Sequence, residues 1–128
     1  MPERTLELSY PASSSTLREI RDRLDQVAGP LLTPAALEDL KLAVTEACAN
    51  AVLHSGSAEF RVTIDVRGGC VEVVVEDDGV YRSVPRTTGG AKVHRGLLLM
   101  ASMVDDLSLH RGTTAEAGTQ VRLRKCAS

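Results

Sequence analysis

Two alternating segments joined by a pair of glycines constrain the fold of this chain more than any other feature. Residues 58–67 place Phe60 and Val62 on one side, and a period of two is typical of a strand with one buried face. The run CVEVVVEDDG, which begins at residue 70, alternates in the same way. Gly68–Gly69 between the two runs is a two-residue hairpin signal. These residues predict a β-hairpin and therefore antiparallel pairing.

The other segments predict helices on one side of that sheet. Apolar stripes and end signals indicate three helices, near residues 15–28, 34–54 and 96–104. Further strands are expected over residues 5–10 and in a closing hairpin made of DLSLHRG and TQVRLRK. Because the strands come in hairpin pairs, the order favours an α+β fold. We expect a two-layer α/β sandwich, with a mostly antiparallel sheet and helices on one face.

Length and composition limit the number of domains and the classes of partner that we expect. The chain has 128 residues and 43% hydrophobic residues, which suits one domain with one core. Aromatic residues make up 2% and the net charge is -2. There is thus neither a stacking platform nor a basic surface for nucleic acid, so we expect no direct nucleic-acid partner.

The sequence also predicts the compartment. No run resembles a signal peptide or approaches the roughly 18 apolar residues of a membrane helix, so we expect no membrane association. Cys48, Cys70 and Cys126 are odd in number and lack metal-ligand spacing. They predict three reduced thiols in a cytoplasmic protein.

One line of polar residues lies on the otherwise apolar second helix. Glu46, Asn50 and His54 follow one another at intervals of four residues and therefore share a face. Two interpretations stay open at this point. The face is either solvent-exposed, or it is the floor of a cleft in which Glu46 and Asn50 serve a metal-bound phosphate. An amide oxygen is a hard ligand that suits Mg²⁺.

Three further elements favour a nucleotide site. Asp77-Asp78-Gly79 ends a strand, where a carboxylate can accept from an exocyclic amine and a glycine admits a planar ring. Arg95-Gly96 opens an apolar helix after residues 80–95, a loop long enough to be functional. The free N–H groups of such a helix start bind anions. Gly118-Thr119 starts the last strand with a small residue and a hydroxyl.

In their order these motifs resemble those of the Bergerat-fold ATPases, which include gyrase-type, chaperone-type and histidine-kinase ATP-binding domains. Within that group the chain is most similar to the small bacterial anti-sigma-factor serine kinases. The resemblance covers about residues 14–125 and rests on EACANAVLH, VEDDG, RGLLLM followed by VDDLSL, and GTQVRLRK. It implies one histidine-kinase-like ATPase domain over residues 1–128, with ATP held between the helical layer and a lid at about residues 80–95.

The resemblance also implies roles for five residues. Glu46 is the catalytic general base that takes the proton from a substrate serine, and Asn50 holds Mg²⁺. Asp77 accepts from the adenine amine, Gly79 makes room for the ring, and Thr119 adds a hydroxyl contact to the base.

A second glycine box is implied to bind the phosphates of ATP. Gly96 gives backbone N–H groups, and the adjoining His94, Arg95 and Leu97 belong to the same cofactor-binding segment. Two positions depart from the family pattern, because Tyr81 and His94 stand where it usually has glycine.

The function implied is an anti-sigma factor that sequesters a sigma factor. It would use Mg-ATP to phosphorylate an anti-anti-sigma antagonist with a STAS domain on serine, and so regulate transcription in a stress response. A homodimer is implied as well. The alternatives are a non-catalytic binding module on the same fold, with weak or lost ATP binding, and a detached ATPase domain of a histidine kinase. The first helix carries Arg18, Arg21 and Arg23, which either dock an acidic partner or form a solvated face.

Overall fold

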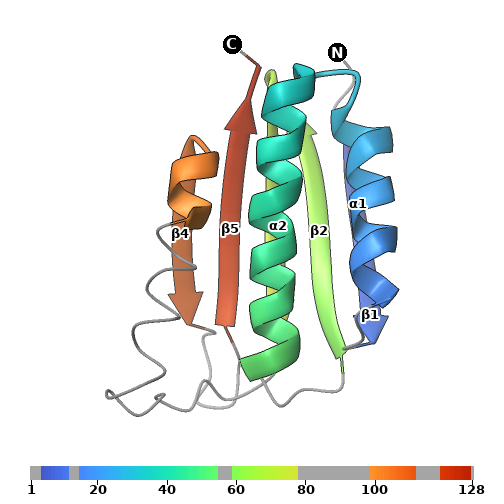
Figure 1. Ribbon diagram of the computed structural model, residues 1–128, viewed down its shortest axis with the longest axis vertical. Coiled ribbons are helices and arrows are strands. Elements are labelled where there is room, and N and C mark those ends of the chain that lie inside the picture. Colours follow the sequence, from blue (N-terminus) through green and yellow to red (C-terminus); the bar gives the residue numbers. More distant parts are fainter. Residues whose placement is uncertain (1–3, 12–14, 55–58, 78–98, 112–118, 128) are drawn as a thin grey trace.

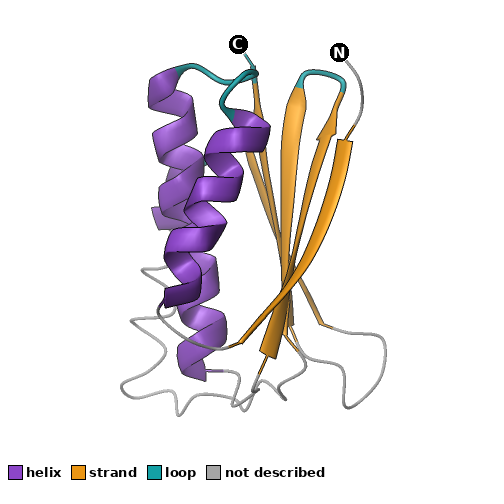
Figure 2. Cartoon of the chain, turned by 90° about the vertical axis from the view of Figure 1, so that its right-hand side faces the viewer, coloured by secondary structure: helices purple, strands orange, loops and turns teal. Residues whose placement is uncertain are grey.

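A computed structural model of the chain describes residues 4–11, 15–54, 59–77, 99–111 and 119–127. These residues form a five-stranded sheet in the order β1-β2-β3-β5-β4, with helices on one face (Figure 1). The elements are β1 (Arg4–Pro11), α1 (Ser15–Ala28), α2 (Pro34–His54), β2 (Glu59–Arg67), β3 (Cys70–Asp77), β4 (Asp106–Arg111) and β5 (Thr119–Cys126). All neighbouring strands are antiparallel. The predicted α+β sandwich is confirmed, and Figure 2 shows its two layers edge-on.

The β2–β3 hairpin forms where the sequence predicts it. Arg67 pairs with Cys70, and the two residues between them, Gly68 and Gly69, have φ values of 54° and 78°. A tight hairpin turn with two positive φ angles matches the twist of the strands, and glycine adopts such angles without steric cost.

The core lies between the sheet and the helices. Alternate residues of β2 and β3 meet the apolar stripes of α1 and α2, as their spacing predicts. The central residues of the core are at most 2% exposed: Ile20, Leu24, Leu40, Val44, Ala47, Phe60, Val62, Ile64, Val71, Val73, Val75 and Leu123. Residues 99–103 are also helical, within the third predicted helix, and Met100 joins the core at 1% exposure. The start of that predicted helix lies outside the described residues.

The C-terminal strand β5 lies inside the sheet, between β3 and β4. This insertion places Cys70 of β3 directly opposite Cys126 of β5, and the two form a disulfide. The prediction of three reduced thiols is therefore wrong for this pair. The reason is the pairing of two strands that are distant in sequence. Cys48 is free and buried.

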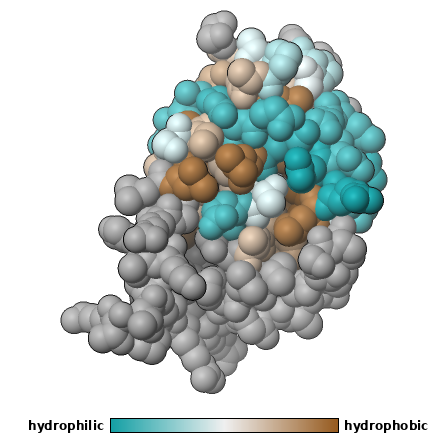
Figure 3. Space-filling view, viewed as in Figure 1, coloured by the Kyte–Doolittle hydropathy of each residue, from teal (hydrophilic) through white to brown (hydrophobic). Residues whose placement is uncertain are grey.

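In the part of the helical face that the described residues form, hydrophilic side chains predominate and a few hydrophobic ones gather between them (Figure 3). Large hydrophobic side chains exposed in the described part of the chain are Leu42, Leu99 and Leu109. Across the described ranges, no helix combines the length and the apolar character that a membrane crossing requires.

Candidate functional site

Helix α2 positions the carboxylate predicted to be catalytic. Its apolar side, which includes Leu40, Val44 and Ala47, is buried against the sheet, and the helix packs on β3 and β5. Glu46 lies beside this buried stripe and is itself partly buried. Within the described residues its carboxylate has no hydrogen-bond or ion-pair partner. A half-buried carboxylate with open acceptor positions suits contact with a ligand, because burial of an unpaired charge is otherwise unfavourable.

Two other predicted site residues lie on neighbouring strands. Strand β3 ends at Asp77 and strand β5 begins at Thr119. The last printed pair of the β3–β5 ladder is Glu76 with Gln120, so Asp77 and Thr119 directly follow that pair on adjacent strands. Their backbones are therefore side by side, as a shared adenine contact requires.

The same end of the molecule carries the C-terminal part of α2. In Figure 1 this end of the helix lies at the level where β5 begins. Asn50 is one turn beyond Glu46 and close to that end. The structure thus brings Asn50, Asp77 and Thr119 to one end of the sandwich. The predicted residues Gly79, His94, Arg95, Gly96 and Leu97, together with the lid at 80–95, lie outside the described residues.

The segment after the predicted phosphate box is tied to β5. The Asp105 N–H donates to the Arg124 carbonyl at 2.9 Å, and the Cys126 N–H donates to Asp105 Oδ2 at 2.7 Å. Lys125 Nζ donates to the Met103 carbonyl at 3.0 Å. These bonds anchor the end of the helical residues 99–103, which come shortly after the box in the sequence, to the strand that begins at Thr119.

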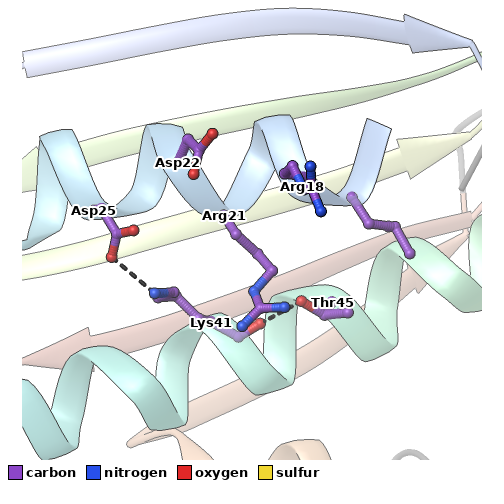
Figure 4. Close-up of a pocket in the computed structure, with 7 residues that line it drawn as sticks. Arg18, Arg21, Asp22, Asp25, Lys41 and Thr45 are labelled. Atoms are coloured by element: carbon purple, nitrogen blue, oxygen red, sulfur yellow. Dashed lines mark hydrogen bonds and ion pairs between the residues drawn. The ribbon is translucent and has the colours of Figure 1, made fainter. Parts of the chain in front are cut away.

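A second surface lies between α1 and α2. A groove of about 460 Å³ is lined by Leu17, Arg18, Arg21, Asp22, Asp25, Lys41 and Thr45. Figure 4 shows Arg21 reaching from α1 toward Thr45, and Lys41 bonded to Asp25 at 2.8 Å. The hydrogen bond from Lys41 to Asp25 raises the pKa of this ammonium group, and a second one to Glu38 adds to the effect. Burial acts against both.

The groove bears on the open question about the arginines of α1. Arg23 reaches Gln26 of its own helix at 3.5 Å. Arg18 and Arg21 line the groove and have no partner among the described residues. Both side chains are exposed, which fits a solvated face as well as contact with a carboxylate-bearing partner.

Sequence reasoning missed two features of this arrangement. Lys41 directly follows Leu40, and nothing in its own surroundings indicates a partner on α1, 16 residues earlier. The disulfide joins cysteines separated by 56 residues and carries no local signal. The disulfide could have been predicted only from the strand order, in which β5 lies beside β3.

The donor set fits a metal-bound nucleotide. Glu46 has a carboxylate without a partner among the described residues, and Asn50, the residue predicted to hold the metal, follows it by one turn on α2. Mg²⁺ takes few protein ligands of this kind and keeps its waters and phosphates.

Comparison with known proteins shows similarity to one domain family and to several curated relatives that share a name. The profile of one protein family, described as histidine kinase-like ATPase domain, matches residues 10–125. Three curated relatives each bear the name Serine-protein kinase RsbW. The protein from Bacillus velezensis is 38% identical over 79 residues, which are 58% of this chain and 49% of the relative. The one from Bacillus subtilis is 37% identical over 79 residues, which again are 58% of this chain and 49% of the relative. A Bacillus cereus protein is 25% identical over 121 residues, or 81% of this chain and 76% of the relative. The alignment thus spans about half the length of the first two relatives.

Proposed function

Because the chain belongs to the histidine kinase-like ATPase domain family, we propose that it is an anti-sigma factor with ATP-dependent serine kinase activity. It binds Mg-ATP and transfers the terminal phosphoryl group to a serine of an antagonist protein. The observation that carries the proposal is the partly buried Glu46 carboxylate, which no described residue engages, on the helix above β3 and β5. The relatives' shared name, a serine-protein kinase, supports the same reaction.

Glu46 acts as the base of this reaction. It accepts the proton of the substrate hydroxyl as the oxygen attacks phosphorus. Asn50 holds Mg²⁺, which when bound neutralises charge on the phosphates. Since both residues belong to one helix, the backbone positions of the proton acceptor and the metal ligand keep a fixed spacing without a loop between them.

The base of the nucleotide lies at the ends of β3 and β5. Val71, Val73 and Val75 alternate under the helices, and Asp77 is the next residue of that alternation. We expect its carboxylate to accept from the adenine amine, with Gly79 leaving room for the ring. Thr119 adds its hydroxyl from the adjacent strand. His94, Arg95, Gly96 and Leu97 supply the phosphate contacts.

The partners follow from the same proposal. The protein sequesters a sigma factor and is released by an anti-anti-sigma antagonist with a STAS domain, as part of a stress response. A cytoplasmic location is required, because sigma factors act on RNA polymerase there. We assign the docking of an acidic partner segment to the groove with Arg18 and Arg21. One domain over residues 1–128 and a homodimer complete the proposal.

Two measurements test it. Calorimetry should detect ATP binding that depends on Mg²⁺, and labelled phosphate should pass from ATP to a serine of the cognate antagonist. Arg21→Glu should weaken binding of the acidic partner segment and leave ATP affinity unchanged. Asp22→Asn in the same groove should not weaken binding of that segment. If no heat is detected at millimolar Mg-ATP while a sigma factor is still bound, the protein is a non-catalytic binding module.

A further inference from the structure

The disulfide between Cys70 and Cys126 lies on the face of the sheet that the helices leave open. Val71, Val73, Val121 and Leu123 point into the helical layer or pack against it. Cys70 and Cys126 alternate with these residues and are therefore on the opposite face. Both cysteines are half-buried and each lines a different pocket. Cys70 lines one of about 310 Å³, and Cys126 one of about 230 Å³. Because both cysteines are partly exposed, small reagents can approach the pair from solvent.

Charged side chains of both signs line the pocket beside Cys70. The pocket contains Asp65, Arg67, Glu72, Asp106 and Arg124. Asp65 is paired with Arg67 at 3.2 Å, and Glu72 is paired with Arg122, also at 3.2 Å.

The remaining cation of the pocket faces the sulfur. The Arg124 guanidinium donates to Cys70 Sγ at 3.5 Å, and Asp106, the residue opposite Arg124 on β4, adds an opposing charge. A guanidinium at a sulfur stabilises the thiolate, which is both the attacking and the leaving form in thiol chemistry.

Backbone hydrogen bonds also hold the strands around the disulfide. Cys126 N–H donates to Asp105, and Ala127 N–H donates to the Gly69 carbonyl at 2.9 Å. Reduction therefore leaves β5 paired, but removes the covalent link that closes a segment of 56 residues. That segment spans the predicted phosphate box and ends with the strand that starts at Thr119. A disulfide in a reducing compartment is usually transient and redox-sensing.

From these observations we propose that Cys70–Cys126 is a reversible redox site that sets how firmly β5 is held in the sheet. In the reducing step, a thiolate of a protein dithiol attacks Cys126 Sγ, and Cys70 leaves as the thiolate beside Arg124. The second thiol of the dithiol then attacks the mixed disulfide, which frees Cys126 and oxidises the dithiol to its disulfide. The two electrons come from the dithiol.

In the oxidising step, hydrogen peroxide is the oxidant. The Cys70 thiolate attacks one peroxide oxygen and becomes a sulfenic acid, with loss of hydroxide. The Cys126 thiol then attacks the sulfenic sulfur, the disulfide forms and water leaves. Two thiols and one peroxide thus give one disulfide and two waters. The reversible cycle assumes the proposed cytoplasmic location, whereas the chemistry of the pair does not.

The first test counts thiols in the intact protein by alkylation and mass spectrometry, without ATP or partner. The peroxide-treated protein should show no reactive thiol in its native state. Incubation with a thioredoxin-type dithiol protein should expose two, and peroxide should close them again. Cys48 is the internal control, because it is buried. Two labelled thiols after peroxide treatment, or a bond that the dithiol protein opens only in denaturant, would overturn the proposal.

The second test measures what the bond does. Reduction should lower the melting temperature by about 10 °C, since the closed segment is long. Amide exchange in β5 should become faster on reduction. The Cys70→Ser and Cys126→Ser variants should behave like the reduced protein in both measurements and should not respond to the dithiol. Equal melting of the oxidised and reduced forms would contradict the proposal.

A third test uses two arginines on the same face of β5. Arg124→Gln should slow closure by peroxide about threefold. Loss of the guanidinium should lower the thiolate fraction of Cys70, and the higher nucleophilicity of a more basic thiolate offsets part of that loss. Arg122→Gln removes an equal charge two residues away that contacts Glu72 rather than sulfur, and should slow closure less than Arg124→Gln does. Equal rates for both variants would remove Arg124 from the proposal.

Discussion

The ion pair between Lys41 and Asp25 should hold α1 against α2. Lys41 Nζ is 2.8 Å from Asp25 Oδ1, and the lysine side chain is 11% exposed whereas that of Asp25 is 46% exposed. A hydrogen bond between charged groups contributes about 1.5–3 kcal/mol when sheltered. Because Asp25 is half in water, we reduce this to about 1 kcal/mol. Over a chain of this size, that equals a shift of about 4 °C in melting temperature.

The assay is a double-mutant cycle by urea denaturation with Lys41→Met, Asp25→Asn and the double variant. Methionine keeps the packing of the lysine stem and removes its charge. We expect a coupling free energy of about 1 kcal/mol. Glu38→Gln is the matched control, because Glu38 contacts the same ammonium at 3.2 Å from its own helix but is 66% exposed. Its coupling to Lys41 should be smaller. A Lys41–Asp25 coupling near zero, or one below that of Glu38, would refute the reasoning.

The pH dependence has a defined sign. The folded pKa of Lys41 is raised above its ordinary value of 10.5. The ammonium therefore binds its proton more tightly in the folded chain. Its contribution is complete below pH 10.5 and is lost as the pH rises through the folded pKa. The difference in stability between wild type and Lys41→Met should be constant at neutral pH and shrink only in strong alkali.

Three other predictions concern the site and the core. Asp77→Asn should weaken ATP binding by about 1–3 kcal/mol in calorimetry, since the contact to the adenine amine loses its charged acceptor; unchanged affinity would remove Asp77 from the site. Asn50→Ala should weaken both Mg-dependent ATP binding and phosphate transfer, and an effect that persists equally without Mg²⁺ would argue against a metal ligand. Burial raises the pKa of the Cys48 thiol, so iodoacetamide at pH 8 should modify it only after unfolding. Rapid labelling of the native protein would contradict that burial.

Local patterns in the sequence predicted the local structure. The glycine pair at 68–69 specified the hairpin, because few other residues accept two positive φ angles. The stripe with Leu40 and Val44 specified which side of α2 is buried. The helix that carries Glu46 and Asn50 was also predicted correctly, whereas the roles of these two residues stay a prediction.

Long-range features were not predictable from the same patterns. The insertion of β5 between β3 and β4 depends on pairing between strands that are distant in sequence. The disulfide and the side-by-side ends of β3 and β5 follow from that insertion. The Lys41–Asp25 pair likewise depends on how α1 packs on α2. Neither helix encodes that packing alone.

The rate of phosphate transfer by Glu46→Gln tests the central claim most directly. The variant keeps the size of the side chain but cannot accept a proton. At saturating Mg-ATP, it should phosphorylate the cognate antagonist on the order of 10²–10⁴ times more slowly than wild type. Its ATP affinity, measured by titration, should stay within about twofold, as expected for a group that acts only in the transition state. Glu38→Gln, the same change two turns earlier on α2, should transfer phosphate normally. If Glu46→Gln transfers phosphate at the wild-type rate, Glu46 is not the base, and the account of this helix is wrong.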